Sequence, residues 1–404
     1  MQAALSLLAN KTYRLLITVN AVGAFGFWFQ ATVLTWVVYA LTNSAAQVGL
    51  IALFQWGPYA VLGLFSVGVA DTYGKRKILL LTQIGYASNS LALCFLALTE
   101  NLTVFAIFAS CVWRSLLMCI EQPARQSLIP AIVATEDLTK MLGFTASLSG
   151  LGRIVAPSVA GVIIGSLGIR YCFIPNVFTS SINLVGLYFL TVALPPRSRK
   201  KFDPVANLRE GLRIVAGQRH IAALLIVLLC VTTLPLSFNV ILPVFAETAL
   251  GGGATTFGTL MSCMGVGAVI ASLIISSRGM TVNSTLGCAI GVGLVQAALY
   301  FQTQFAPVAA LMAVVGGCAV GLIVGTNAII LTRTESAEHG RVGGLFSYIV
   351  NAIGPMGSVV MGFIVAGGGA HAGLALGATI AITAGAIAML AVHRMDGPDD
   401  GSLG

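Results

Sequence analysis

The sequence predicts an all-α polytopic membrane protein. Only 8% of its 404 residues are charged and 57% are hydrophobic, whereas soluble domains carry about 25% charged residues. So few charges cannot cover the surface of a soluble chain of this size, so lipid must be the solvent for most of it. Lipid requires every backbone polar group to be bonded internally, and apolar runs of roughly 20 residues suit spanning helices rather than barrel strands.

Twelve such spans are expected, in two sets of six. The first set is expected near residues 13–41, 47–69, 78–98, 103–128, 138–165 and 170–193. The second set is expected near residues 220–246, 255–276, 284–303, 307–331, 341–365 and 371–393. The predicted units are therefore an N-terminal six-helix bundle, a polar linker, a C-terminal six-helix bundle and a tail, at residues 1–194, 195–219, 220–393 and 394–404.

The positions of the basic residues predict the orientation. With both termini and the linker in the cytoplasm, 18 of the 21 Lys and Arg residues lie on the cytoplasmic side, as the positive-inside rule requires. The formal net charge of +8 is therefore a signal of topology. Nucleic acid is excluded as a partner because the basic residues are spread over separate loops.

The two predicted bundles repeat each other. Ala156-Pro157 lies in the fifth span of the first set and Gly354-Pro355 in the fifth span of the second, 198 residues later. Matching helix breaks predict two pseudo-symmetric bundles with a pathway between them.

The loop after the second predicted span carries the most specific motif. In this loop Gly74 permits a tight turn, Asp71 can accept hydrogen bonds at a helix N-terminus, and Lys75 and Arg76 favour the cytoplasmic face. These four residues match, in register, the signature loop of the major facilitator superfamily, which the stretch 67–79 resembles, although Thr72 replaces an arginine. The resemblance implies that the loop latches the two halves in the outward-facing state. A simple positive-inside turn is the alternative.

A second motif lies in the fifth span and resembles the antiporter motif of the same superfamily. Its residues are Gly143, Gly152, Ala156, Pro157, Ala160 and Gly161. Small residues with a proline give a kinked, closely packed helix, and an ordinary packing helix is the alternative. The resemblance favours export. Two short segments, 122–130 and 340–345 with 354–357, resemble the enterobactin and macrolide exporter branch.

Charged residues within the spans are candidates for function because they are costly in lipid. Arg114, Glu121 and Arg153 lie inside predicted spans, and Glu121 can pair with Arg125 four residues later. Glu121 is the only acidic residue inside any predicted span, so it is the first candidate for proton coupling, with Asp71 as the second. The alternative is a structural network that joins the fourth and fifth spans.

Polar and aromatic residues within the spans predict a cavity for an amphiphilic solute. The candidates are Asn20, Trp28, Gln30, Gln55, Trp56, Phe238, Asn239, Asn327 and Asn351. The alternative is that they form hydrogen bonds between helices and aromatic belts at the membrane surface.

These features predict a secondary transporter in the inner membrane. The first hypothesis is a proton-coupled exporter of an amphiphilic, anionic organic compound, such as a drug, macrolide or siderophore, that works by alternating access. A lipid transporter or nutrient importer of the same superfamily is the alternative, and a membrane enzyme or receptor is more remote. The expected partners are a small-molecule substrate, protons and the lipid bilayer, without a cofactor or metal, and the chain is expected to act as a monomer.

The orientation can be tested by labelling. Cysteines introduced at Ser198 in the linker and Ser402 in the tail should resist a membrane-impermeant thiol reagent in intact cells, because both lie in predicted cytoplasmic segments. Both should react after lysis. Labelling of either cysteine without lysis would overturn the orientation.

Overall fold

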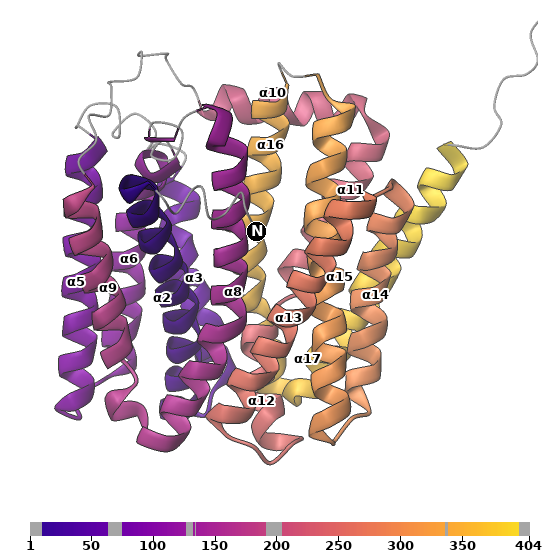
Figure 1. Ribbon diagram of the computed structural model, residues 1–404. Coiled ribbons are helices and arrows are strands. Elements are labelled where there is room, and N and C mark those ends of the chain that lie inside the picture. Colours follow the sequence, from indigo (N-terminus) through magenta and orange to yellow (C-terminus); the bar gives the residue numbers. More distant parts are fainter. Residues whose placement is uncertain are drawn as a thin grey trace, which may run out of the picture.

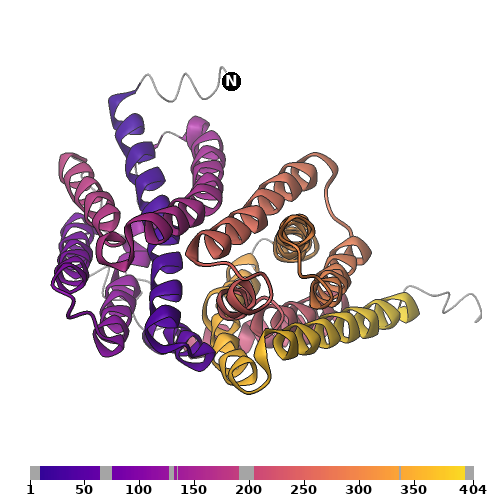
Figure 2. The ribbon, with the colours of Figure 1, turned by 90° about the horizontal axis from the view of Figure 1, so that it is seen from below.

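The computed structural model describes residues 10–63, 75–126, 132–133, 135–190, 204–335 and 338–395. Within these ranges every regular element is a helix. The helices form two groups that stand side by side, one from each half of the chain (Figure 1, Figure 2). The all-α, two-bundle prediction is therefore confirmed.

The first half contains six crossings. Its helices are α2 (Lys11–Thr42), α3 (Ala45–Leu62), α5 (Lys75–Leu98), α6 (Val104–Gln126), α8 (Thr135–Leu167) and α9 (Ile174–Phe189), with a short helix η1 (Ile169–Tyr171) before α9. The turn from α2 to α3 shows how sequence sets the boundaries. Asn43 adopts φ 48° as the C-cap of α2, and the Ser44 side chain accepts a hydrogen bond from the Gln47 N–H to cap α3. Asparagine tolerates this left-handed conformation and serine is a favoured N-cap.

The second half follows a linker helix, α10 (Pro204–Gly217). Its elements are α11 (Arg219–Thr233), α12 (Phe238–Thr248), α13 (Ala254–Arg278), α14 (Val282–Tyr300), α15 (Phe305–Arg333), α16 (His339–Tyr348), the π-helical turn η2 (Ile349–Ile353) and α17 (Gly354–Met395). The described residues contain 11 helices apolar and long enough to span a membrane, and one of them, Arg341–Arg394, is 54 residues long. Gly369, with φ 71°, divides that helix into two crossings, which gives the predicted twelve.

The seventh span differs from the prediction of one helix over 220–246. It is two helices, α11 and α12, separated at residues 234–237. Pro235 lacks an N–H and cannot continue the helical hydrogen bonding. The Pro235 carbonyl instead accepts a hydrogen bond of 2.5 Å from the side chain of Gln296 in α14, which is fully buried. A distant side chain therefore stabilises the break.

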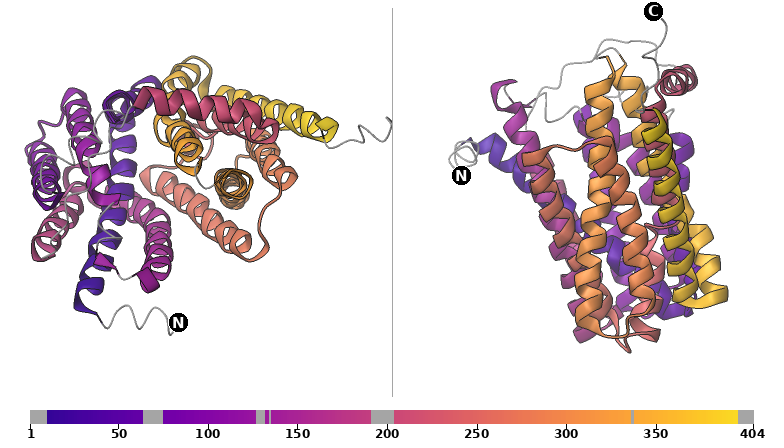
Figure 3. Two further views of the ribbon diagram at one scale, coloured as in Figure 1. Left: turned by 90° about the horizontal axis from the view of Figure 1, so that it is seen from above. Right: turned by 90° about the vertical axis from the view of Figure 1, so that its right-hand side faces the viewer.

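The helices run between two ends of the molecule. We call the end that carries α10, the start of α2 and the last residues of α17 the linker end, and the opposite end the far end (Figure 1, Figure 3). The connections α5–α6, α8–α9, α12–α13 and α14–α15 lie at the far end (Figure 1).

The two halves meet at two glycine crossings that mirror each other. Where α8 crosses α13, a Cβ on Gly161 would lie 2.7 Å from the Ala254 carbonyl oxygen and 3.1 Å from the Gly258 Cα. Where α17 crosses α3, a Cβ on Gly362 would lie 2.8 Å from the Ala45 carbonyl oxygen and 3.1 Å from the Gly49 Cα. Only glycine permits backbones to approach this closely.

The crossing of α3 and α17 can be tested with matched glycines on one helix. Gly362→Leu should lower the midpoint of thermal unfolding in detergent, because overpacking costs about 1–3 kcal/mol. Gly367 has open space around its Cα on the same helix, so Gly367→Leu should leave the midpoint unchanged. Equal midpoints for the two variants would contradict the crossing.

Candidate substrate cavity

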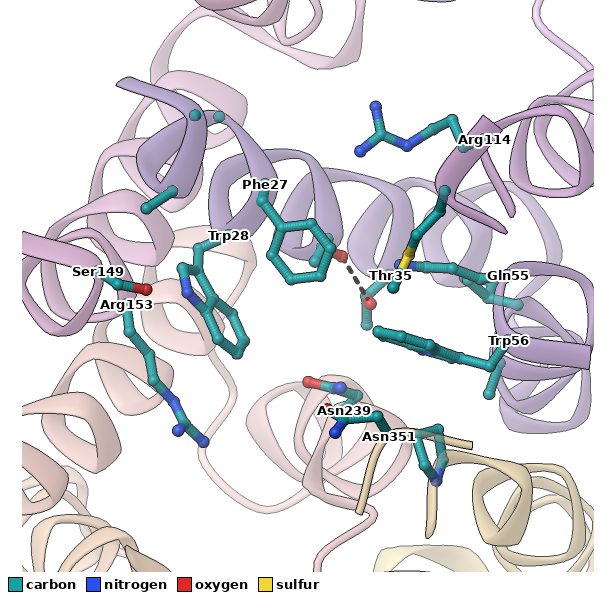
Figure 4. Close-up of a pocket in the computed structure, with 18 of the residues that line it drawn as sticks. Phe27, Trp28, Thr35, Gln55, Trp56, Arg114, Ser149, Arg153, Asn239 and Asn351 are labelled. Carbon is teal, nitrogen blue, oxygen red and sulfur yellow. Dashed lines mark hydrogen bonds between the residues drawn. The ribbon is translucent and has the colours of Figure 1, made fainter. Parts of the chain in front are cut away.

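A cavity of about 800 Å³ lies between the two halves. Residues of α2, α3, α5, α6, α8 and α9 line it from the first half, and residues of α11–α13, α15, η2 and α17 line it from the second. Figure 4 shows Phe27, Trp28 and Trp56 on the side of the first half and Asn239 and Asn351 on the opposite side. This volume lies within the range of organic ligand pockets.

Among the described residues, the charged groups that line the cavity all come from the first half. Among the lining residues, they are three arginines and one glutamate, namely Arg114, Arg125, Arg153 and Glu121. If all four are ionised, the cavity lining carries two surplus positive charges. The residues that line it from the second half are uncharged.

Glu121 is held in a tight network. Glu121 is 6% exposed. Its Oε1 accepts hydrogen bonds from Gln83 Nε2 at 2.9 Å and from Arg125 Nε at 2.8 Å. The predicted pairing with Arg125 is therefore confirmed, with 2.5 Å between Nη2 and Oε1. Arg114, Met118, Glu121 and Arg125 all line the cavity, so the charged stripe of α6 faces this cavity rather than lipid.

The other two arginines lie against aromatic rings. The Arg114 guanidinium is 5.2 Å from the ring centre of Tyr86, and that of Arg153 is 4.9 Å from the ring centre of Trp28. No carboxylate of the described residues forms an ion pair with either arginine. Cation–π contacts orient the guanidinium groups but do not neutralise them, so both remain able to bind an anion.

Most of the residues predicted to line the cavity do so. These are Asn20, Trp28, Gln55, Trp56, Phe238, Asn239 and Asn351. Two of the predicted residues lie outside the lining. Gln30 accepts a hydrogen bond of 2.6 Å from Asn176, because it lies on the side of α2 that faces α9. On α15, Ile323 lines the cavity and Asn327, one helical turn nearer the linker end, does not.

Helix α9 also contributes to the cavity, although none of its residues was predicted to do so. Asn176, Thr179, Ser180 and Asn183 line the cavity, and their spacing of i, i+3, i+4 and i+7 places them on one helix face. The opposite face of α9 is apolar and exposed, with Phe178 and Ile182 among its residues. This two-faced pattern was present in the sequence and indicates a helix between lipid and a polar interior.

Most of the signature-loop motif lies outside the part of the chain that the structure describes. Asp71 and Gly74 lie outside the described residues, and so does the side chain of Lys75. Arg76 donates a hydrogen bond of 3.0 Å to the Tyr188 carbonyl at the end of α9, which joins two helices of the same half. The latch therefore remains a prediction.

The residues of the antiporter-like motif pack α8 against both of its neighbours. A Cβ on Gly152 would lie 3.1 Å from the Phe25 N of α2, and Gly161 meets α13 at the crossing described above. Ala156 and Ala160 are fully buried, and Pro157 lines the cavity. Gly143 lies in α8. The motif therefore lies both at the crossing of α8 with α13 and in the wall of the cavity. Its link to export stays a prediction.

Contacts between the halves lie toward the far end, beyond the described lining of the cavity. The Tyr39 hydroxyl donates a hydrogen bond of 2.5 Å to Glu247 Oε2, which joins the ends of α2 and α12. One turn earlier, Trp36 stacks on Phe257 of α13 with 5.8 Å between ring centres. Toward the linker end the cavity reaches Arg125, the penultimate residue of α6.

Comparison with known proteins places this geometry in a family. A family model described as transmembrane secretion effector, a branch of the major facilitator superfamily, matches residues 2–400. The staphyloferrin A transporter of Staphylococcus aureus is 23% identical over 62% of this chain, and the match covers 63% of that relative, which is less than two thirds of its length. The enterobactin exporter EntS of Escherichia coli is 24% identical over 77% of this chain and 74% of the relative.

Solved structures show the same fold. A point mutant of the nucleoside transporter NupG has a TM-score of 0.72 at 14% identity, and the match covers 95% of this chain and 100% of that one. A bacterial homologue of the human lysosomal transporter Spinster has a TM-score of 0.68 at 16% identity, with 95% and 97% covered. Because the family model spans nearly the whole chain, this multi-pass membrane protein belongs to the transmembrane secretion effector family of major facilitator superfamily transporters.

Proposed function

We propose that this transporter is a proton-coupled exporter of an amphiphilic organic anion. The observation that carries the proposal is the charge of the cavity, which combines three arginines with a single glutamate. Burying unpaired charge in a medium of low polarity is expensive unless a counter-charge compensates it. A carboxylate or another anionic group on the substrate supplies that counter-charge.

Arg153 is the residue best placed to bind the anion. It extends from the middle of α8 into the cavity beside Trp28 (Figure 4) and has no carboxylate partner among the described residues. Arg125, in contrast, is already paired with Glu121. A planar guanidinium suits carboxylate recognition because it can donate two parallel hydrogen bonds.

Aromatic side chains supply the apolar part of the site. Phe27, Trp28 and Trp56 line the cavity, and the ring centres of Phe27 and Trp56 are 6.4 Å apart. Flat aromatic surfaces beside a cation favour a substrate that carries both an apolar ring and an anionic group. The relatives named as an enterobactin exporter and a staphyloferrin A transporter support a siderophore or a similar organic acid.

Alternating access explains how such a substrate would cross. In the proposed orientation the linker end faces the cytoplasm, so the cavity receives substrate from inside while the Tyr39–Glu247 contact closes the outside. Opening the far end requires this contact and the Trp36–Phe257 stack to separate. The exporter among the relatives supports outward transport. The alternative function, import of a nutrient, would run the same cycle in the opposite direction.

Glu121 is the proposed coupling group. It lines the cavity and lies in the same network as Gln83 and Arg125, on the same helix as Arg114. A change in its protonation would change the net charge beside the arginines, and with it the affinity of the cavity for an anion.

Vesicle transport tests the coupling. Proteoliposomes with an imposed pH gradient should accumulate an aromatic carboxylate from a test panel, and Glu121→Gln should abolish the response to the gradient while downhill flux persists. Glu100→Gln is the matched control because Glu100 is exposed and pairs with Arg170 at the far end. If Glu121→Gln lowers thermal stability and transport per folded molecule keeps its pH dependence, the network is structural.

Equilibrium binding tests the anion site. Arg153→Gln should weaken binding of an aromatic carboxylate about tenfold or more, because a hydrogen bond to a charged group contributes about 1.5–3 kcal/mol. Binding of the matching primary amide should change much less. Arg170→Gln serves as the control because Arg170 is exposed at the far end. Equal losses for the carboxylate and the amide would count against an anionic substrate.

A further inference from the structure

The cavity extends into the interior of the first half. We call this part the inner lobe; its lining includes Asn20, Gln83, Tyr86, Thr179, Ser180 and Asn183. They belong to α2, α5 and α9. The inner lobe belongs to the same cavity as Trp28, Arg153 and Asn239, which Figure 4 shows around the space between the halves.

Glycines on α2 bring the polar face of α9 close. A Cβ on Gly26 would lie 2.7 Å from Thr179 Oγ1, so a larger residue would push the two helices apart. A Cβ on Gly23 would lie 3.4 Å from Asn183 Nδ2, an ordinary contact distance. Gly23 therefore leaves space for about a methyl group next to the Asn183 amide.

Helix packing accounts for some of the polar atoms on α9 but not for all. Asn176 donates to Gln30 at 2.6 Å, and Ser180 shares a hydrogen bond of 3.0 Å with Ser90 of α5. Asn183 is 6% exposed, and within the described part of the chain no donor reaches its Oδ1. A buried acceptor without a donor is destabilising, so its retention in the cavity wall needs another explanation.

We propose that the inner lobe is a second subsite, which binds a neutral hydrogen-bond donor of the transported substrate, a hydroxyl or an amide N–H, through Asn183 Oδ1. The inference rests on the proposed function, in which the anionic group of the same molecule binds at Arg153. The substrate is thus recognised at two points, by charge between the halves and by a hydrogen bond inside the first half. In this proposal a hydroxyl or N–H of the substrate donates the hydrogen bond that Asn183 Oδ1 lacks.

A pair of ligands that differ by one hydroxyl tests the subsite. The probes are phenylalkanoates and their para-hydroxyphenyl counterparts in a series of increasing chain length, measured by isothermal titration against the purified full chain. At one chain length the hydroxyl should tighten binding to the wild type about tenfold, because it satisfies a buried acceptor. Asn183→Leu should abolish this preference and keep the affinity for the phenyl compound.

Two further variants separate the subsite from a folding effect. Asn183→Leu should unfold at the same temperature as the wild type or higher, since the atom it removes has no partner among the described residues. Gly23→Ala leaves Asn183 in place and should also reduce the preference, because its methyl group occupies the space beside the amide. Asn89→Leu is the matched control. Asn89 is a buried asparagine with an unpartnered Nδ2, and it lies outside the cavity lining.

The outcomes distinguish the subsite from the proposed function. Equal affinities for the two probes at every chain length, as expected if a water molecule fills the inner lobe without loss, would overturn the subsite. A preference that survives in Asn183→Leu would do the same. If the preference is absent but Arg153→Gln still weakens both probes, the anion site stands alone. If Arg153→Gln weakens neither probe, the proposed function fails, whatever the hydroxyl preference.

Discussion

The close approach of the two halves at their glycine crossings is the constraint on which the rest of this structure depends. Gly161 and Gly362 each place their helix in backbone contact with the opposite half. This contact allows the far ends of α2 and α12 to meet, so that Tyr39 can reach Glu247. In lipid there is little hydrophobic force between helices, and small residues that permit close packing supply the association instead. Larger side chains at these positions would push the two helices of each crossing apart.

The two halves match at their glycine crossings but differ in the charge of the residues that line the cavity. All the charged residues of the described lining belong to the first half, whereas the second half contributes neutral residues such as Asn239 and Asn351. The carboxylate of this described lining, Glu121, is held in hydrogen bonds from Gln83 and Arg125. One bundle therefore supplies the charged side chains of the described cavity wall, and the other bundle supplies neutral ones.

Periodicity within a helix was enough to predict much of this arrangement. The i, i+4 spacing predicted the ion pair of Glu121 with Arg125, and the cost of charge in lipid singled out Arg114, Glu121 and Arg153 as candidates. Features that depend on contacts between distant segments could not be predicted in this way. The break at Pro235 is stabilised by Gln296, 61 residues later. Similarly, the rotation of α2 decides that Trp28 faces the cavity while Gln30 faces α9.

Among the described residues, two pieces of irregular backbone in the second half lie next to the cavity. The break between α11 and α12 and the π-helical turn η2 both contribute lining residues. The break is also tied to α17, because Ser237 Oγ donates to the Thr233 carbonyl at 2.7 Å and Ser358 Oγ of α17 donates to Ser237 Oγ at 3.2 Å. A broken helix and a π turn leave fewer regular hydrogen bonds to disrupt when a helix bends. The charged groups of the cavity lie on α6 and α8 of the first half, across the cavity from this irregular backbone.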